Sequence, residues 1–185
     1  MRNTFFDFLQ IMFDSDLLFT HENLTSNFCQ MKPAISIVIP AFEEQDRLGD
    51  SVREILRYIE SNEMLAELII VDDGSKDKTA ETGEKVCAEF PSVPSKVIRY
   101  EKNRGKGFAV KTGLLAASAD IAIFSDADLS TPIEELPKLV EPIQKGKFDL
   151  TFGSRALDRS LIGERQPWRR EQGGKVFNLI VRTLT

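Results

Sequence analysis

Leu68-Ile69-Ile70-Val71-Asp72-Asp73-Gly74-Ser75 is the stretch that decides the fold. Its first four residues form a short apolar run typical of a buried strand, and two carboxylates and a glycine follow at once. Residues 79–90 then show helical spacing, and Asp77 is placed to cap that helix. A buried strand that leads directly into a helix is half of a βαβ unit, so this stretch predicts a parallel sheet.

The same alternation continues on both sides of this stretch. We expect further strands at 35–39, 96–100, 121–124 and 148–152, and further helices at 47–60, at 107–118, from Thr131 (N-cap) and Pro132 (first turn), and after Pro167. Strands that alternate with helices predict an α/β fold with a mainly parallel sheet. Ligands of such sheets bind beyond the carboxyl ends of the strands.

Composition narrows the class of protein. The chain has 185 residues, of which 42% are hydrophobic, and its formal net charge is -5. This is an ordinary globular composition, and no basic face that would predict a nucleic-acid partner is apparent. Cys29 and Cys87 form no metal-ligand pattern, so we interpret them as reduced packing residues of a cytoplasmic protein. No apolar run reaches the ~18 residues of a membrane helix.

The sequence changes character near Met31. Residues 1–34 are aromatic and acidic at first and lack a clear period, whereas the regular alternation starts at residue 35. One interpretation is an amphipathic helix that touches a membrane or a partner, and the other is that translation starts at Met31. We favour the second, so residues 1–34 are an expected extension and 35–185 the expected domain.

Carboxylates follow the strand predicted at 121–124. Asp126 and Asp128 flank Ala127, and two carboxylates this close repel each other unless a cation lies beside them. A hard divalent ion with oxygen ligands meets that need and would neutralise charge on a departing nucleoside diphosphate. The alternative is a pair of solvated loop aspartates near the start of the next helix. Polar and charged residues also follow the other predicted strands, and this favours the metal site over the solvated loop.

Polar residues also follow other predicted strands, where they could bind a ligand or have only a structural or surface role. Asp72 or Asp73 could accept an N–H of a nucleobase, or could simply form a turn at Gly74. Glu43 and Glu44 follow the first strand, where one of them could orient a base or ribose or both could be surface charges. Arg155, with Arg169 or Arg170, offers guanidinium groups that suit a diphosphate.

The stretch from Gly105 to Thr112 nearly forms a phosphate-binding P-loop. Val110 stands where that pattern, and equally the dinucleotide pattern GxGxxG, requires glycine. We therefore interpret it as a loop that contributes Lys106 to a nucleotide. A nucleotidyltransferase would need a glycine-rich turn after the first strand, and residues 40–48 contain no glycine.

Five strings in this order and spacing resemble glycosyltransferase family 2. They are IPAFEEQDRL (39–48), IIVDDGSKDKT (69–79), NRGKGFAVKTG (103–113), FSDADLSTP (124–132) and FGSR (152–155). Within the family they are most similar to the polyprenyl-phosphate sugar transferases, especially the dolichyl-phosphate glucosyltransferase-like group. The resemblance implies a GT-A fold, a three-layer α/β sandwich, with a UDP-sugar or GDP-sugar donor and a Mg²⁺ or Mn²⁺ ion.

The resemblance also implies roles for individual residues. The nucleotide sugar would be held by Pro40, Ala41, Glu43, Asp72, Asp73, Lys106, Asp126, Ala127, Asp128, Arg155 and Arg170. Asp126 and Asp128 would bind the metal, and with Arg155 they would form the catalytic set. Mannosyl-transferring relatives often carry Gln where Ser130 stands here, so UDP-glucose is favoured over GDP-mannose.

The implied acceptor is dolichyl or undecaprenyl phosphate, whose oxygen attacks the anomeric carbon with inversion. An acceptor that is already anionic needs no strong general base, so positioning and electrostatics carry the catalysis. This predicts a protein of the cytoplasm or of the cytoplasmic face of a membrane, with peripheral membrane contact. Because the chain stops at Thr185, we expect that the C-terminal part of the fold is missing. The alternatives are a polysaccharide acceptor and a module that binds nucleotide sugar without turnover.

Overall fold

The computed structural model describes residues 32–153. The chain forms two compact units, Met1–Glu141 and Pro142–Thr185. The predictions for residues 1–31, for Arg155, Arg169 and Arg170 and for the last helix lie outside the described residues. The elements in chain order are β1 (Ile35–Ala41), α3 (Leu48–Ser61), β2 (Ala66–Asp72), α4 (Thr79–Ala88), β3 (Ser95–Arg99), α5 (Lys106–Leu115), β4 (Ile121–Phe124), the 3₁₀ turn η1 (Ile133–Glu135) and α6 (Leu136–Gln144).

Four strands form one sheet in the order β3-β2-β1-β4, and all pairs are parallel. The predicted α/β class with a mainly parallel sheet is therefore confirmed. β1 and β2 are buried along their whole length because they lie at the centre of the sheet, whereas β3 and β4 at its edges are only partly buried. This burial explains why the two central strands read as continuous apolar runs.

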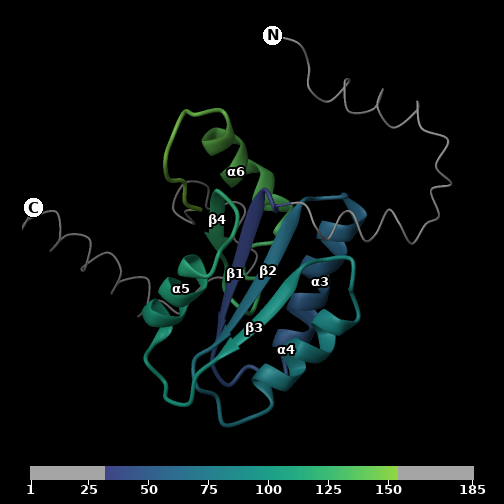
Figure 1. The fold of residues 1–185 in the computed structure, drawn as a ribbon, viewed down its shortest axis with the longest axis vertical. Coiled ribbons are helices and arrows are strands. Elements are labelled where there is room, and N and C mark those ends of the chain that lie inside the picture. Colours follow the sequence, from purple (N-terminus) through teal and green to yellow (C-terminus); the bar gives the residue numbers. More distant parts are fainter. Residues whose placement is uncertain (1–31, 154–185) are drawn as a thin grey trace, which may run out of the picture. The chain divides into compact units, whose positions relative to one another are not determined.

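Helices cover both faces of the sheet. α3 and α4 lie on one face and α5 on the other (Figure 1). The first face holds the larger core, in which Ile37, Ile39, Leu68 and Ile70 of the strands pack with Val52, Ile55, Leu56 and Ile59 of α3. On the opposite face Val38, Ile69 and Val71 pack with Ala109 of α5.

Gly113 lets α5 lie close to the sheet. A Cβ atom at this position would be 2.2 Å from Cγ1 of Val38, closer than real Cβ contacts come, and a tight 3.1 Å from Cγ2 of Val71. Only glycine therefore fits without moving the helix away from β1 and β2. The spacing between α5 and the central strands depends on this one residue.

The direction in which successive strands are added to the sheet reverses at β1. The chain passes from β1 outward through β2 to β3 and then returns by α5 to β4 on the other side of β1. The crevice at such a switch point, beyond the carboxyl ends of the strands, is where open parallel sheets bind ligands. The fold therefore directs attention to the residues that follow β1, β2 and β4.

Two predicted elements differ from the structure. Residues 148–152 form no strand, and Phe148, Leu150 and Phe152 are exposed. A strand needs a neighbour for its backbone, and within the described residues no strand pairs with this segment. Thr131 does not cap a helix, because Pro132 has an extended ψ of 144° and a 3₁₀ turn comes between it and α6.

Candidate functional site

The carboxyl ends of β1, β2 and β4 lie side by side. In the sheet register Ala41 at the end of β1 is opposite Asp72 at the end of β2. On the other side of β1, Val38 is opposite Phe124, and the N–H of Ser125 donates to the carbonyl of Val38 at 3.0 Å. The loops that begin at residues 42, 73 and 125 therefore leave the sheet at one edge.

Hydrogen bonds join the β1–α3 loop to the β2–α4 loop. The N–H of Glu43 donates to the hydroxyl oxygen of Ser75 at 2.9 Å, and the N–H of Glu44 donates to that of Thr79 at 2.9 Å. The N–H of Asp73 donates to the carbonyl of Ala41 at 2.8 Å. Glu43 itself adopts a left-handed conformation with φ 53°. Such a conformation is uncommon outside glycine and clusters at functional sites.

Asp72 and Asp73 are both buried at the end of β2, with 0% and 2% of their surface exposed. Oδ1 of Asp72 accepts from the N–H of Ser75 at 3.0 Å and from its hydroxyl, while Oδ2 accepts no hydrogen bond and lies 3.3 Å from Nε of Arg99. Oδ1 of Asp73 accepts from the N–H of Arg104 at 2.9 Å. Buried carboxylates with spare acceptor capacity can bind an N–H donor of a ligand.

Tyr100 and Phe108 extend this part of the site. The hydroxyl of Tyr100 is buried without a hydrogen-bond partner of good geometry, and burial, together with the nearby Asp73 carboxylate, raises its pKa. The Tyr100 ring meets the ring of Phe108 edge to face, and the guanidinium of Arg104 lies 3.5 Å from the centre of the Phe108 ring. A cation over an aromatic face is a favourable contact, which holds Arg104 beside Asp73.

The two aspartates after β4 have different partners. Asp126 forms an ion pair with Lys106, the first residue of α5. Asp128 accepts from the N–H of Ser130 at 3.0 Å and from its hydroxyl at 2.6 Å, and these bonds lower the pKa of Asp128. Leu129 between Asp128 and Ser130 is left-handed, with φ 45°. The loop after β4 and the first residue of α5 thus present two carboxylates and one lysine at the switch point.

The family model for glycosyl transferase family 2 matches residues 36–181, a range that includes every one of these loops. The chain belongs to glycosyl transferase family 2. It is 33% identical over 163 residues to the dolichyl-phosphate beta-glucosyltransferase of Homo sapiens, covering 80% of this chain and 49% of that protein. It is 36% identical over 144 residues to the dolichol-phosphate mannosyltransferase of Pyrococcus furiosus, covering 78% of this chain and 35% of that protein.

The family 2 chain thus spans half or less of the length of these relatives. Among solved structures, glucosyl-3-phosphoglycerate synthase from Mycobacterium tuberculosis in complex with Mn²⁺, UDP-glucose and phosphoglyceric acid aligns at 28% identity. Its TM-score is 0.49, and the alignment covers 72% of this chain and 46% of that one.

Most of the predicted residues of the family 2 site lie at or near the carboxyl ends of the strands, but the exposure of their side chains differs. Glu43, Lys106, Asp126 and Asp128 have exposed or partly exposed side chains. Pro40, Ala41 and Ala127 are buried, and Ala41 and Ala127 belong to the hydrophobic core. These three can shape the crevice or offer backbone groups, but their side chains are not open to a ligand.

Sequence reasoning missed Ser75, Tyr100, Arg104 and Phe108. Three of them lie inside or beside the quoted strings, yet no role followed from that position. Ser75 bonds to Glu43 and Arg104 bonds to Asp73, and both pairs are far apart in sequence, so no local pattern could reveal these two contacts. Phe108 contacts Tyr100 and Arg104 within one short stretch of the chain. The usable signal was the polar Ser75, which follows two aspartates and a glycine.

The donor set of the site fits a divalent cation only if the ligand completes it. Among residues 32–153 no group of three or more His, Cys, Asp or Glu side chains could hold a metal. Asp126 and Asp128 supply hard oxygen donors from one loop. Mg²⁺ is commonly bound by one or two carboxylates together with substrate phosphates and water, so two carboxylates are sufficient.

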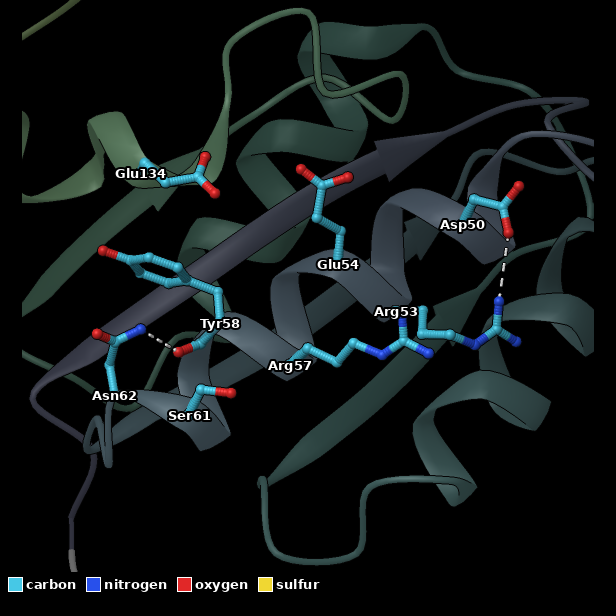
Figure 2. A pocket seen from close by; sticks show the side chains of 8 residues that line it. All are labelled: Asp50, Arg53, Glu54, Arg57, Tyr58, Ser61, Asn62 and Glu134. Atoms are coloured by element: carbon cyan, nitrogen blue, oxygen red, sulfur yellow. Dashed lines mark hydrogen bonds and ion pairs between the residues drawn. The ribbon is translucent and has the colours of Figure 1, made fainter.

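A separate hollow of the surface lies along the outer side of α3 (Figure 2). Its lining residues are Asp50, Arg53, Glu54, Arg57, Tyr58, Ser61, Asn62 and Glu134. It contains none of the predicted site residues, and Arg53 already pairs with Asp50 and Glu89. The candidate site is therefore the one at the strand ends.

No helix in the part of the chain that the structure describes is long and apolar enough to span a membrane.

Proposed function

We propose that this chain binds a nucleoside diphosphate sugar at the carboxyl ends of β1, β2 and β4. We further propose that the whole protein transfers the sugar, with inversion, to a polyprenyl phosphate. The observation that carries the proposal is the position of Asp72, Asp73, Lys106, Asp126 and Asp128 around the switch point of a parallel sheet. The similarity to a dolichyl-phosphate beta-glucosyltransferase and a dolichol-phosphate mannosyltransferase supports the acceptor class.

The nucleoside has acceptors on the β2 side of the crevice. Asp72 and Asp73 provide buried carboxylate oxygens for an N–H of the base, and the strained backbone at Glu43 faces the same loops. A uracil or guanine ring offers N–H donors of this kind. Ser130 in place of the Gln of mannosyl-transferring relatives favours UDP-glucose as the donor.

The diphosphate has counter-charges on the β4 side. Asp126 and Asp128 would hold Mg²⁺ or Mn²⁺, which when bound neutralises negative charge on the diphosphate. Lys106 forms an ion pair with Asp126 and would add a positive charge for the same phosphates. The family resemblance adds Arg155 and Arg170, which lie outside the described residues.

In the transfer step an anionic oxygen of the acceptor phosphate forms a bond to the anomeric carbon. The bond from that carbon to the β-phosphate oxygen breaks on the opposite face, and the nucleoside diphosphate leaves with the electron pair. Because no proton must be removed from the acceptor, this chain's contribution is to orient the donor and to stabilise charge on the leaving group. A lipid acceptor places the reaction at the cytoplasmic face of a membrane.

One observation favours a second candidate, a chain that binds the donor but does not turn it over. The chain spans 49% and 35% of the two relatives. A donor site that is complete within this length would bind nucleotide even where the acceptor site is built by further residues.

Calorimetric titration of UDP and of GDP into the chain, with Mn²⁺ and then with EDTA, tests the proposal. We expect binding of one nucleotide, UDP before GDP, that is lost with EDTA. Absence of binding by both would contradict a donor site in this chain. Transfer of labelled glucose from UDP-glucose to dolichyl phosphate then separates the transferase from the binding module.

A further inference from the structure

Two buried serines in this chain make the same pair of hydrogen bonds at opposite ends of the sheet. Ser75 follows the carboxyl end of β2, and Ser36 lies near the amino end of β1; their exposed fractions are 4% and 0%. Each hydroxyl donates to a buried carboxylate, Ser75 to Asp72 and Ser36 to Glu67. Each also accepts a backbone N–H, from Glu43 at 2.9 Å and from Ala119 at 3.1 Å.

The hydroxyl of Ser75 has no further hydrogen to donate. It carries one proton, which it gives to Oδ1 of Asp72, and its oxygen therefore meets the Glu43 N–H as an acceptor. The backbone of Ser75 is held as well, because its N–H donates to Asp72 and its carbonyl accepts from Arg99 at 3.0 Å. The hydroxyl thus has a fixed position between two loops.

Both partners of this hydroxyl need an external constraint. Glu43 has a φ of 53°, a conformation that persists only where the surroundings hold it. Asp72 is fully buried, and its Oδ2 accepts no hydrogen bond. A rotation of the Asp72 carboxylate or a relaxation at Glu43 would change the acceptor groups on the β2 side of the crevice.

We infer that Ser75 is a positioning residue for the nucleoside, because its single hydroxyl sets both the carboxylate of Asp72 and the backbone at Glu43. The hydroxyl of Ser75 is already engaged with the Asp72 carboxylate and the Glu43 N–H, so Ser75 acts through these two groups and not by touching the ligand. The inference rests on the proposed function, and it adds a residue to which the family resemblance assigned no role.

Ser75→Ala tests the inference, with Ser36→Ala as the matched control. Both variants remove a buried hydroxyl that bridges a carboxylate and a backbone N–H, so both should lower the melting temperature. At a temperature where both variants are fully folded, Ser75→Ala should weaken UDP binding about tenfold, as expected when a buried group loses its hydrogen-bond partner. Ser36→Ala should bind UDP like the wild type.

Hydrogen exchange of the Glu43 amide adds a measurement without nucleotide. Exchange should accelerate in Ser75→Ala and stay unchanged in Ser36→Ala, since only the first loses the acceptor for that N–H. If Ser75→Ala does not fold, Ser75→Cys replaces the oxygen by a sulfur that is a weak donor and acceptor of nearly the same size, and the same changes are expected.

The outcomes separate the inference from the function on which it rests. Wild-type UDP affinity in Ser75→Ala, an unchanged Glu43 amide, or an equal loss of affinity in Ser36→Ala would each overturn the positioning role while leaving the donor site in place. A wild-type chain that binds neither UDP nor GDP would overturn the proposed function itself, and the positioning role with it.

Discussion

At the scale of single residues, the site combines buried carboxylates that are already fixed with exposed ones that are open to a ligand. Asp72 and Asp73 are held by hydrogen bonds from their own and a neighbouring loop. Asp126 and Asp128 lie in a loop after an edge strand, where a lysine and a serine are their partners. This division matches the two halves of a nucleotide, a flat base that needs fixed partners and a diphosphate that needs charge.

Asp128→Ala should abolish metal-dependent UDP binding and leave the melting temperature almost unchanged. Asp128 is exposed, and its carboxylate accepts hydrogen bonds from the N–H and the hydroxyl of Ser130, two residues away. Its loss would therefore remove a proposed metal ligand but little packing. Calorimetry with and without Mn²⁺ measures the first effect.

The control for Asp128→Ala is Asp120→Ala, which removes another exposed aspartate, paired with Lys32 just before β4. It should bind UDP and Mn²⁺ normally. Equal metal dependence in Asp128→Ala and wild type would rule out the assignment of Asp126 and Asp128 as metal ligands.

The residue scale shows what a sequence can and cannot predict. The sequence could predict that Asp72, Asp73, Asp126 and Asp128 lie at or just after the ends of strands of one parallel sheet, and the structure places them there. Their roles toward a ligand stay a prediction. The bridge from Ser75 to Glu43 was not predictable, because it joins residues 32 positions apart and depends on the backbone conformation of Glu43.

At the scale of elements, the sheet is secured at both ends of its strands. Beyond the carboxyl ends the loops after β1 and β2 bond to each other. At the amino ends, Oε1 of Glu67 on β2 accepts from the hydroxyls of Ser36 and Ser118 at 2.6 and 2.7 Å, and Oε2 lies 3.4 Å from Nζ of Lys96 on β3. This buried group ties β1, β2, β3 and the segment after α5 together.

Acid should weaken this end of the sheet. Burial acts to raise the pKa of Glu67, but hydrogen bonds from Ser36 and Ser118, with Lys96 nearby, bring it below its ordinary value of 4.5. A carboxyl whose pKa is lowered by folding stabilises the fold above its unfolded pKa and loses that contribution as the pH falls through the folded value.

Urea unfolding of the wild type and of Glu67→Gln at pH 7 and at pH 3.5 measures this effect. The wild type should lose more free energy of unfolding between the two pH values than the variant. An equal loss in both proteins would mean that Glu67 does not contribute to the acid sensitivity.

Gly113→Ala should destabilise the fold through the contact between α5 and β1. A Cβ atom would meet Val38 at 2.2 Å, and overpacking of this kind typically costs about 1–3 kcal/mol. Gly107→Ala in the same helix is the control, because a Cβ atom there meets nothing within 4 Å and alanine favours a helix by about 1 kcal/mol.

Urea unfolding compares these two variants of α5. The free energy of unfolding should fall for Gly113→Ala and stay equal or rise for Gly107→Ala. Equal stability of the two variants would show that α5 can move away from β1 at little cost.

The elements were predicted correctly where pattern and burial coincide. β1 and β2 are central, so their apolar runs identify them without ambiguity. The alternating residues 148–152 suggested a strand by the same logic, but alternation predicts a face and not a partner, and the described residues supply none. Thr131 and Pro132 suggested a helix start, and the extended ψ of Pro132 delays it.

At the scale of the whole molecule, the strand order explains why the loops after β1, β2 and β4, which carry the candidate site residues, lie close together. A parallel sheet could be expected from the sequence, but the order β3-β2-β1-β4 could not, because nothing local says on which side of β1 the fourth strand lies. That order places Asp126 and Asp128 next to the end of β1 instead of at the far edge beyond β3. The proposed donor site therefore depends on the topology of the sheet as much as on the sequence motifs.

The central claim is that a nucleotide binds at this switch point, and hydrogen exchange measured amide by amide with saturating UDP and Mn²⁺ tests it most directly. The account predicts added protection at 42–45, 73–76, 104–108 and 125–130, and no change along the exposed side of α3 from Asp50 to Asn62. Protection confined to α3, or nucleotide binding that leaves the four loops unchanged, would contradict it.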